Sequence, residues 1–252
     1  MENLSVVIIT LNEERNIERC LLSVGEVADE IIVLDSYSTD STESICKKMG
    51  VKFFQHKFDG HIQQKNRALD LSSHNLVFAL DADEVPNKKL LGEIKNIKEN
   101  NTHDAYFFNR MTNYCGKWIK HSGWYPDKKL RIWNKTKGKW GGVNPHDEVI
   151  MQKGSTKKYL RGDLLHYSYY SIGQHITQIN SFTEIGAGEA FKLGKKSNIF
   201  IAVFKSAWKF LRDYFINLGV LDGYYGFVIC SLSAQATFVK YLKLRELNKQ
   251  TK

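Results

Sequence analysis

Three carboxylates follow directly on one apolar run of the sequence. The run 76–80 reads LVFAL, and Asp81, Asp83 and Glu84 come immediately after it. Like charges about 4 Å apart near a protein surface repel by about 4 kcal/mol, so a positive group must offset them. Mg²⁺ and Mn²⁺ prefer oxygen ligands and commonly bridge one or two carboxylates to a diphosphate. The Asp-x-Asp spacing therefore predicts a site for one of these ions, with a solvated acidic turn as the alternative.

Polar residues also end two other apolar runs, at 4–10 and 30–35. The first run leads into Thr10, Leu11, Asn12 and Glu13, and the second ends in Asp35 and Ser36. A carboxylate at the position of Asp35 can accept hydrogen bonds from a ribose or a base. Asp40 with Glu43, a few residues later, instead resembles a capping box that begins a helix. These positions predict a second part of a ligand site beside Asp81.

The runs that carry these residues predict a parallel sheet. Apolar segments at 4–10, 30–35, 51–54 and 76–80 do not alternate with polar residues, which is typical of strands covered on both faces. Helical spacing lies between them, at 13–24, 39–50 and 62–72. Such a β-α order predicts an α/β fold with a Rossmann-like, mostly parallel sheet flanked by helices. Ligands of these sheets bind at the carboxyl ends of the strands, where the polar residues above converge.

The pattern changes after about residue 104. Short strand-like segments continue to about 168, and four of the five tryptophans fall between 118 and 140. Flat aromatic rings can stack on sugar faces, so these tryptophans, Trp124 among them, predict a sugar-binding wall; packing in the core is the alternative. From 171 onward the pattern is helical. We expect a domain 1–185 that carries the site and a helical C-terminal extension, 186–252.

Charge and composition bound the class of partner. The 252 residues contain 36 Lys and Arg against 27 Asp and Glu, a net charge of +9 with a pI near 9.2, which favours anionic partners. The four cysteines show no metal-binding spacing, so we expect free thiols in a reducing compartment. The N-terminal residues lack a basic stretch followed by a long apolar one, so we expect no secretory signal and a cytoplasmic protein.

The C-terminal segment 187–252 holds most of the excess positive charge. It has eleven Lys and Arg against four Asp and Glu, a net charge of +7. Its longest uncharged run, 223–239, has seventeen residues, whereas a membrane span needs about 20. A basic amphipathic segment on an anionic membrane surface is therefore favoured, with plain helical packing or a true span as alternatives. We expect a peripheral contact with the inner face of the cytoplasmic membrane.

Four motifs, taken together and in order, resemble those of the family 2 nucleotide-sugar glycosyltransferases. They are VVIITLNEERNIERCLLSV, EIIVLDSYSTDST, QQKNRALDLSSHNLVFALDADE and KLRIWNKTKGKWGGVNPHDEV. The likeness covers residues 3–170 and extends to the bacterial subgroup that resembles lipopolysaccharide-core β-1,4-glucosyltransferases. It implies a GT-A-type fold, a nucleotide-sugar donor, Mg²⁺ or Mn²⁺, and a glycan or glycolipid acceptor.

The resemblance also implies roles for individual residues at the donor site. Residues 10–13 match the motif beside the nucleotide, and Asp35 with Ser36 matches the acid that contacts uracil or ribose. Lys65 and Asn66 match a pair of a basic residue and an asparagine near the donor pyrophosphate, and Arg67 follows directly. The metal motif falls on Asp81, Ala82 and Asp83, with Asp83 as the direct ligand.

The catalytic base of the family should lie in NPHDEV. Asp147 and Glu148 are both candidates, and His146 precedes them; Asp147 is favoured, without excluding Glu148. A positioned carboxylate can take the proton of an attacking hydroxyl. His166 is a candidate for approaching the metal or a phosphate, with a structural histidine as the alternative. Arg131 is a candidate for fixing the base or contacting a phosphate.

The function implied is inverting, metal-dependent transfer of a hexose, glucose from UDP-glucose, during cell-surface glycan or lipopolysaccharide-core synthesis. A sugar nucleotidyltransferase or pyrophosphorylase is the alternative, although the sequence TLNEERN lacks the Gly-rich basic loop usual after the first strand of those enzymes. A nucleic-acid-binding protein is disfavoured, because acids rather than bases crowd the strand ends. A dehydrogenase is disfavoured by the lack of Gly-x-Gly-x-x-Gly after that strand.

Overall fold

The computed structural model describes residues 1–143 and 146–250, without the side chains of residues 143 and 146. The chain divides into two compact units. Unit 1 comprises Met1–Arg110 and Asp127–Tyr167, and unit 2 comprises Met111–Pro126 and Ser168–Lys252. The chain passes from one unit to the other within strands β6 (Ala105–Tyr114) and β11 (Lys157–Tyr169). The expected functional boundary after residue 185 stays a prediction; residue 185 lies inside the helix α5 (Ile172–Lys192), which by compactness groups with the later helices.

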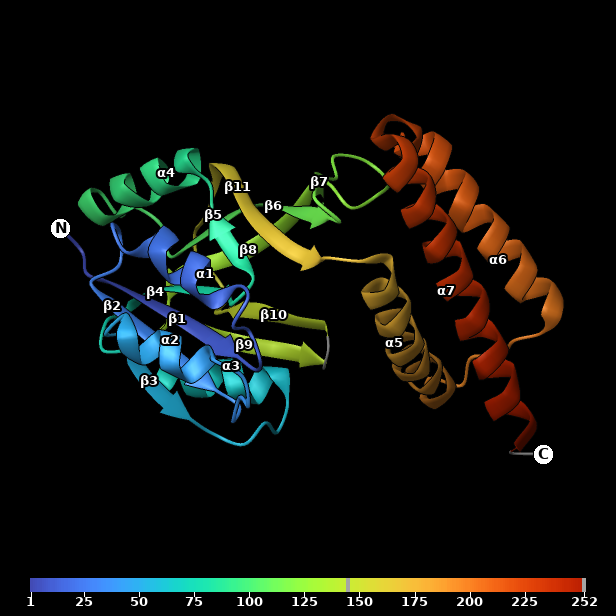
Figure 1. Cartoon of the computed structure of the whole chain (residues 1–252), viewed down its shortest axis with the longest axis horizontal. Coiled ribbons are helices and arrows are strands. Elements are labelled where there is room, and N and C mark those ends of the chain that lie inside the picture. Colours follow the sequence, from blue (N-terminus) through green and yellow to red (C-terminus); the bar gives the residue numbers. More distant parts are fainter. Residues whose placement is uncertain (144–145, 251–252) are drawn as a thin grey trace. The chain divides into compact units, whose positions relative to one another are not determined.

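In residues 1–110, 127–143 and 146–167, unit 1 contains a sheet, four helices and a small hairpin, numbered in chain order in Figure 1. Its first elements are β1 (Leu4–Thr10), α1 (Ile17–Val24), β2 (Glu30–Asp35), α2 (Thr42–Lys48), β3 (Lys52–Gln55), α3 (His61–Asp70) and β4 (Leu76–Asp81). They are followed by β5 (Glu84–Pro86), α4 (Lys88–Glu99), β6, β8 (Asp127–Asn134), β9 (Gly138–Val143), β10 (His146–Met151) and β11.

The sheet begins with four parallel strands and continues with antiparallel ones. β1 pairs in parallel with β2 and β4, and β3 pairs in parallel with β2. The full order is β3-β2-β1-β4-β8-β6-β11-β5, in which β8 runs antiparallel to β4. The expected α/β fold with a Rossmann-like arrangement of parallel strands, flanking helices and a C-terminal helical extension is confirmed. β9 and β10 form a separate antiparallel hairpin.

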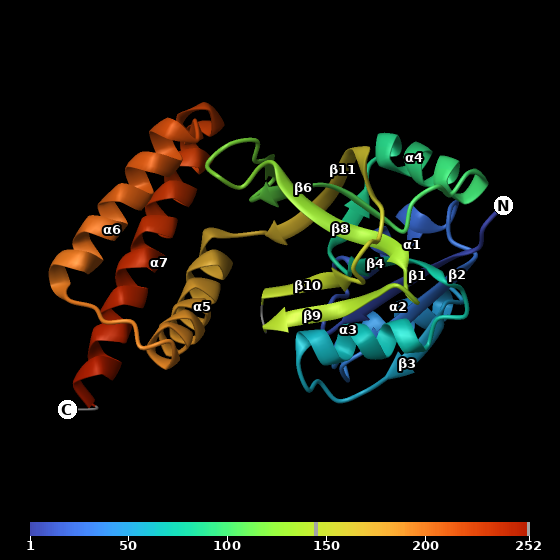
Figure 2. The same cartoon turned by 180° about the vertical axis from the view of Figure 1, so that it is seen from behind.

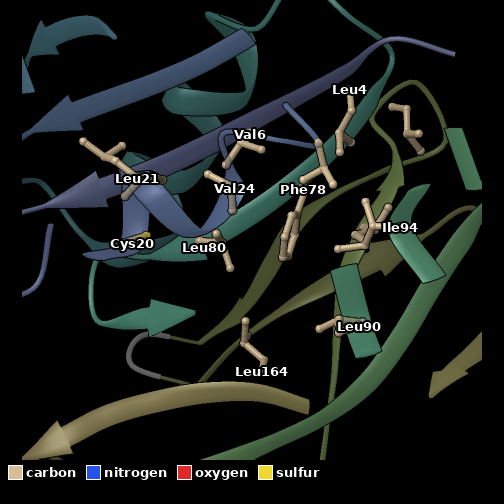
Figure 3. Close-up of a cluster of buried hydrophobic side chains, with 14 of the residues drawn as sticks. Leu4, Val6, Cys20, Leu21, Val24, Phe78, Leu80, Leu90, Ile94 and Leu164 are labelled. Atoms are coloured by element: carbon tan, nitrogen blue, oxygen red, sulfur yellow. The ribbon is translucent and has the colours of Figure 1, made fainter. Parts of the chain in front are cut away.

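The central strands are buried on both faces, as their uninterrupted apolar sequence predicts. Val6 and Ile8 of β1 pack with α1, α2 and α4 in one hydrophobic cluster, which includes Phe78 of β4 (Figure 3). Val7, between them in sequence, points to the opposite face and packs in a second cluster with α3 and β9. The two clusters fix β1 and β4 rigidly, so the residues at their carboxyl ends are held in place.

In its described residues, unit 2 contains three long helices, two short helical segments and a short strand. Its elements are β7 (Lys117–Trp118), α5 (Ile172–Lys192), α6 (Ile199–Leu211), a π-helix η1 (Arg212–Ile216), a 3₁₀-helix η2 (Gly219–Asp222) and α7 (Gly223–Gln250). α7 packs against both α5 and α6, and both views show α6 and α7 side by side (Figures 1 and 2). An aromatic cluster formed by Tyr114, Trp124, Tyr169 and His175 ties the first part of the unit to α5.

Among the residues that the structure describes, no single helix is long and apolar enough to cross a membrane. Two helical segments, Ile199–Ile216 and Gly219–Gln250, are long and apolar enough only when taken together, and the chain bends by 72° at the break between them.

Candidate active site

The register of the parallel strands brings the polar strand ends together. Thr10 of β1 lies opposite Asp35 of β2, and the neighbouring Ile9 lies opposite Asp81 of β4. The side chain of Thr10 is buried, and its hydroxyl has no hydrogen-bond partner among the described residues. One edge of the sheet therefore carries the carboxylates of Asp35 and Asp81 together with the Thr10 hydroxyl, which has no hydrogen-bond partner among the described residues.

Asp81 is held between two cations from elsewhere in unit 1. Lys65 of α3 places its Nζ 3.0 Å from Oδ1, and Arg131 of β8 places Nη2 2.8 Å from Oδ2. Although burial opposes ionisation, these two cations hold the pKa of Asp81 well below its usual range. Asp81 is thus an ionised, oriented carboxylate at the end of β4.

Glu84 has a structural role that the sequence analysis missed. Its side chain is fully buried; it accepts the backbone N–H of Asp81 at 3.0 Å and pairs with Arg131 at 2.9 Å. Arg131 therefore fixes Asp81 and Glu84 rather than the candidate base. The only sequence signal for this role was the acidic cluster itself, because the partner lies 47 residues away.

Asp83 faces a histidine. His166 Nε2 of β11 lies 3.1 Å from Asp83 Oδ2, and the side chains are 15% and 20% exposed, respectively. The backbone places them, because the Asp83 carbonyl accepts the Tyr167 N–H at 2.9 Å. His166 Nδ1 is buried and has no partner among the described residues. A carboxylate and an imidazole nitrogen thus converge at an accessible point beside Asp81.

The two candidate bases point in opposite directions, because successive side chains of a strand alternate. Asp147 of β10 joins the cluster, with Oδ2 2.8 Å from Lys65 Nζ, and its side chain is 14% exposed. Glu148 is exposed. The structure brings Asp147, and not Glu148, beside Asp81; the side chain of His146 lies outside the described residues.

The loop after β1 is built against the loop after β2. Asn12, in the left-handed backbone region with φ 55°, accepts the Thr39 N–H at 2.8 Å, and its own N–H donates to Ser38. Both oxygens of Asp35, which is fully buried, accept hydrogen bonds from Ser38. These bonds hold Asp35 in a fixed orientation.

Four further predicted donor-site residues lie along or beside these loops. Ser36 accepts a hydrogen bond from Gln64 at 3.1 Å, Leu11 is 50% exposed, and Ala82 is buried between the two metal-motif acids. Burial raises the pKa of Glu13 to about 7, and nearby carboxylates, Asp83 first among them, add to the rise.

The three residues of helix α3 that were expected near the pyrophosphate contact different parts of unit 1. Lys65 reaches the cluster and lies 4.5 Å from the centre of the Trp140 ring. Asn66 instead binds the backbone of Trp140 through two hydrogen bonds, at 2.9 and 3.0 Å. Arg67 pairs with Asp59 at 3.0 Å. Asn66 therefore fastens the β9–β10 hairpin to α3, and Arg67 fastens the loop before α3.

The tryptophans divide between two settings. Trp133 and Trp140 are buried in the core of unit 1, where their rings meet edge to face at 5.7 Å. For these two the core-packing alternative holds. Trp118 and Trp124 belong to unit 2, where Trp124 packs in the aromatic cluster with Tyr114.

The charges at this edge leave room for a cation. Within the described residues, four carboxylates, Asp81, Asp83, Glu84 and Asp147, face three cations, Lys65, Arg110 and Arg131, which leaves an excess of one negative charge. No group of three or more His, Cys, Asp or Glu in residues 1–143 and 146–250 is placed to hold a metal ion. A Mg²⁺-like ion needs only one or two protein ligands when substrate phosphates and water complete its shell, so Asp83 and His166 fit one.

Comparison with known proteins places this arrangement in a family. Residues 5–162 match the model of Glycosyl transferase family 2. The chain is 33% identical over 258 residues to an uncharacterized glycosyltransferase of Rickettsia typhi, covering 98% of this chain and 88% of the relative. It is 26% identical over 249 residues to the lipopolysaccharide core biosynthesis glycosyltransferase LpsC of Rhizobium meliloti, covering 96% and 91%.

Among solved structures, similarity extends over part of the chain. Glucosyl-3-phosphoglycerate synthase from Mycobacterium tuberculosis, in a complex with Mn²⁺, UDP and glucosyl-3-phosphoglycerate, matches with a TM-score of 0.37 and 25% identity over 44% of each chain.

Proposed function

Because the chain belongs to glycosyl transferase family 2, we propose that it transfers glucose from UDP-glucose to a saccharide acceptor with inversion at the anomeric carbon. The observation that carries this proposal is the edge of the sheet where Asp35, Asp81 and Asp83 meet beside Asp147. The acceptor we infer is a growing glycan or glycolipid of the lipopolysaccharide-core class, on the similarity to LpsC.

The nucleotide would occupy the ends of β1 and β2. A carboxylate has about four acceptor sites, and hydrogen bonds from Ser38 and Gln55 occupy three of those of Asp35, which leaves one to accept an N–H of uracil or a ribose hydroxyl. The unpartnered Thr10 hydroxyl lies at the same edge. Residues 11–13 and Ser36 line the two loops that would enclose the nucleoside.

The diphosphate would lie beside Asp83. Asp83 and His166 would hold Mg²⁺ or Mn²⁺, and this ion, when bound, supplies the positive charge that offsets the diphosphate leaving group. Lys65 and Arg131 keep the neighbouring Asp81 ionised and hold its two carboxylate oxygens in place. A contact of Arg67 with the pyrophosphate stays a prediction, and that contact would require Arg67 to leave Asp59.

The acceptor hydroxyl would lose its proton to Asp147. The Asp147 carboxylate lies 2.8 Å from Lys65 Nζ, and this ion pair holds it in place beside the donor side of the site. A positioned general base contributes about 10²–10⁴-fold to the rate. Glu148 faces away from this cluster and remains the alternative base.

We place the enzyme in the cytoplasm, at the inner face of the membrane. The four cysteines are all free thiols, which suits a reducing compartment. The net charge of +7 over residues 187–252 suits contact with an anionic membrane surface, where a glycolipid acceptor would be found.

Thermal unfolding with and without ligands tests the donor site. We expect UDP-glucose with Mn²⁺ to raise the melting temperature by about 5 °C or more at about 100 times its Kd, and EDTA to abolish the rise. Asp83→Asn should lose the rise, whereas the control Asp70→Asn, an exposed aspartate at the end of α3, should keep it. A rise that ignores Mn²⁺, or an equal rise with GDP- and dTDP-sugars, contradicts the proposal. Release of UDP rather than pyrophosphate during turnover separates it from a nucleotidyltransferase.

A further inference from the structure

Helix α6 and the break after it expose an unusual amount of apolar surface. Phe200, Phe204, Trp208, Leu211 and Phe215 recur every three or four residues, so they form one stripe along the helix. Phe200 is 81% exposed, Phe204 72% and Trp208 50%. We call these five residues the apolar stripe. Contiguous exposed patches of large apolar side chains mark interaction or membrane sites.

The break between α6 and α7 extends this surface around the end of the hairpin. Ile216, Leu218, Leu221 and Tyr224 are each 47–69% exposed. We call these four residues the hairpin tip. Within the described part of the chain, nothing covers the stripe or the tip, because each of these side chains keeps about half or more of its surface in solvent.

The bend at the tip is built into the sequence. Gly223 has φ 61° and ψ −139°, a conformation that side chains disfavour. Gly226 packs so closely on the Gly219 carbonyl that a Cβ would overlap it. The bend of 72° is therefore a packed feature, and the two helices do not form one straight span.

Acidic and basic side chains occupy different places around the apolar surface. Its two acids, Asp213 and Asp222, are both buried in the break, 1% and 3% exposed. The cations beside the stripe follow one another at helical spacing: Lys205 is exposed, while Lys209 and Arg212 share the one acid Asp213, at 2.7 and 2.9 Å. An apolar stripe flanked by bases suits an anionic lipid surface.

We propose that the apolar stripe and the hairpin tip insert into one leaflet of a bilayer that contains anionic phospholipid. This inference rests on the membrane contact proposed above and adds its surface, its depth and its lipid class. The continuous helical segment Ile199–Ile216, α6 with its continuation η1, has 18 residues and is about 27 Å long, shorter than the hydrocarbon core of about 30 Å. Because its exposed apolar side chains form one stripe, it lies along the interface. A second copy of the chain is a poorer occupant, because it would bring a second row of bases, from another chain of net charge +9, against the first.

Vesicle flotation with the full-length protein tests the insertion. We expect the protein to float with vesicles of phosphatidylethanolamine and phosphatidylglycerol and to bind pure phosphatidylcholine at least about fivefold more weakly. Phe200→Ser with Phe204→Ser should lower the partition coefficient by roughly tenfold or more. The matched control is Leu22→Ser, which removes a 67% exposed leucine of α1 in unit 1 and should leave flotation unchanged.

A depth measurement and two further readouts separate the outcomes. Brominated acyl chains should quench Trp208, and the bromine-dependent part of the quenching should be lost in Trp208→Phe. Flotation that is unchanged in the double variant, or a lipid-independent dimer that the double variant dissociates, overturns the proposal. The thermal shift by UDP-glucose is measured on the same variants. If the double variant loses flotation but keeps the thermal shift, the membrane surface has failed while the donor site is intact. If Asp83→Asn loses the thermal shift but still floats, the donor site has failed while the membrane surface is intact.

Discussion

Aspartates at the donor edge of unit 1 and at the helix break of unit 2 are bonded in different ways. Asp222 is 3% exposed, and its carboxylate accepts the N–H groups of Lys120 and His121, the His121 ring and the Ser122 hydroxyl, at 2.9–3.2 Å. Asp83 is one-fifth exposed at its side chain and contacts His166.

The difference separates a structural acid from an acid that can bind a ligand. Donors from three consecutive residues fill the acceptor sites of Asp222, so it can only hold the loop 120–122 against the helix break. Asp83 retains oxygen lone pairs and access to solvent, and it lies where the charge balance is negative. Burial of an acid alone therefore does not indicate a site; the source and number of its donors do.

The largest expected effect is at the candidate base. Asp147→Asn should lower the transfer rate by about 10²–10⁴-fold while UDP-glucose still raises the melting temperature, because the proton acceptor is lost and the donor contacts remain. Glu148→Gln, on the opposite face of β10, is the matched control and should change the rate by no more than about threefold. Single-turnover release of UDP measures both. A collapse in Glu148→Gln with Asp147→Asn active would reverse the assignment.

The opposite kind of aspartate should show the opposite phenotype. Asp222→Ala leaves several donors of the loop 120–122 unsatisfied, so we expect the free energy of opening of unit 2 to fall by about 3 kcal/mol. Hydrogen exchange over residues 199–230 measures this loss. Asp83→Ala should change that exchange little and remove donor binding instead. If Asp222→Ala also abolished donor binding with unit 1 still protected, the two classes of acid would not be distinct.

Burial should give unit 2 a sensitivity to acid. It lowers the pKa of His175 to about 4, from an ordinary value of about 6.5. Below pH 6.5 His175 is protonated in the unfolded chain but stays neutral in the folded chain. The free energy of unfolding therefore falls by about 2 kcal/mol between pH 6.5 and pH 5. His175→Gln should weaken this dependence, as measured by hydrogen exchange of α5 at the two pH values. An unchanged slope in the variant would assign the acid sensitivity to other groups.

The same cause should act in the opposite direction in unit 1. Burial raises the pKa of Glu13 to about 7, so the folded chain keeps a proton that the unfolded chain releases above about pH 4.5. Stability from this group is complete below pH 4.5 and is lost as pH rises through 7. Solvent screening makes this effect the smallest, about 1 kcal/mol. Glu13→Gln should remove it, as urea unfolding at pH 5 and pH 8 would measure; an equal loss in the variant would count against the raised pKa.

The sequence predicted the parallel half of the fold closely. The runs expected at 30–35 and 76–80 became β2 at Glu30–Asp35 and β4 at Leu76–Asp81, because a strand buried on both faces needs uninterrupted apolar residues. Strands β5 and β9 were not predicted: they are short, and β9 is rich in glycine, so neither carries a clear period. The capping box was also misplaced, since α2 begins after Ser41 and Asp40 bonds Thr42 instead.

Contacts between residues far apart in the sequence limited how much of the site could be predicted from the sequence. Strand ends are adjacent by topology, so the order of strands and helices in the sequence was enough to group Asp35, Asp81 and Asp83. The partners Lys65 of Asp147 and His166 of Asp83 are 82 and 83 residues away in sequence, and only packing brings them together. The residue types indicated a carboxylate base, and tertiary packing determines that Asp147, rather than Glu148, faces the site.

A single ammonium group joins the two halves of the proposed reaction centre. Lys65 Nζ contacts Asp81, on the donor side, and Asp147, the candidate base, at 3.0 and 2.8 Å. Substitutions at these three positions should therefore not add: once Lys65 is replaced, further loss at either aspartate should be smaller than in the native chain. Kinetic defects from single variants at this trio will overlap, and only double-mutant cycles will apportion them between donor retention and proton removal.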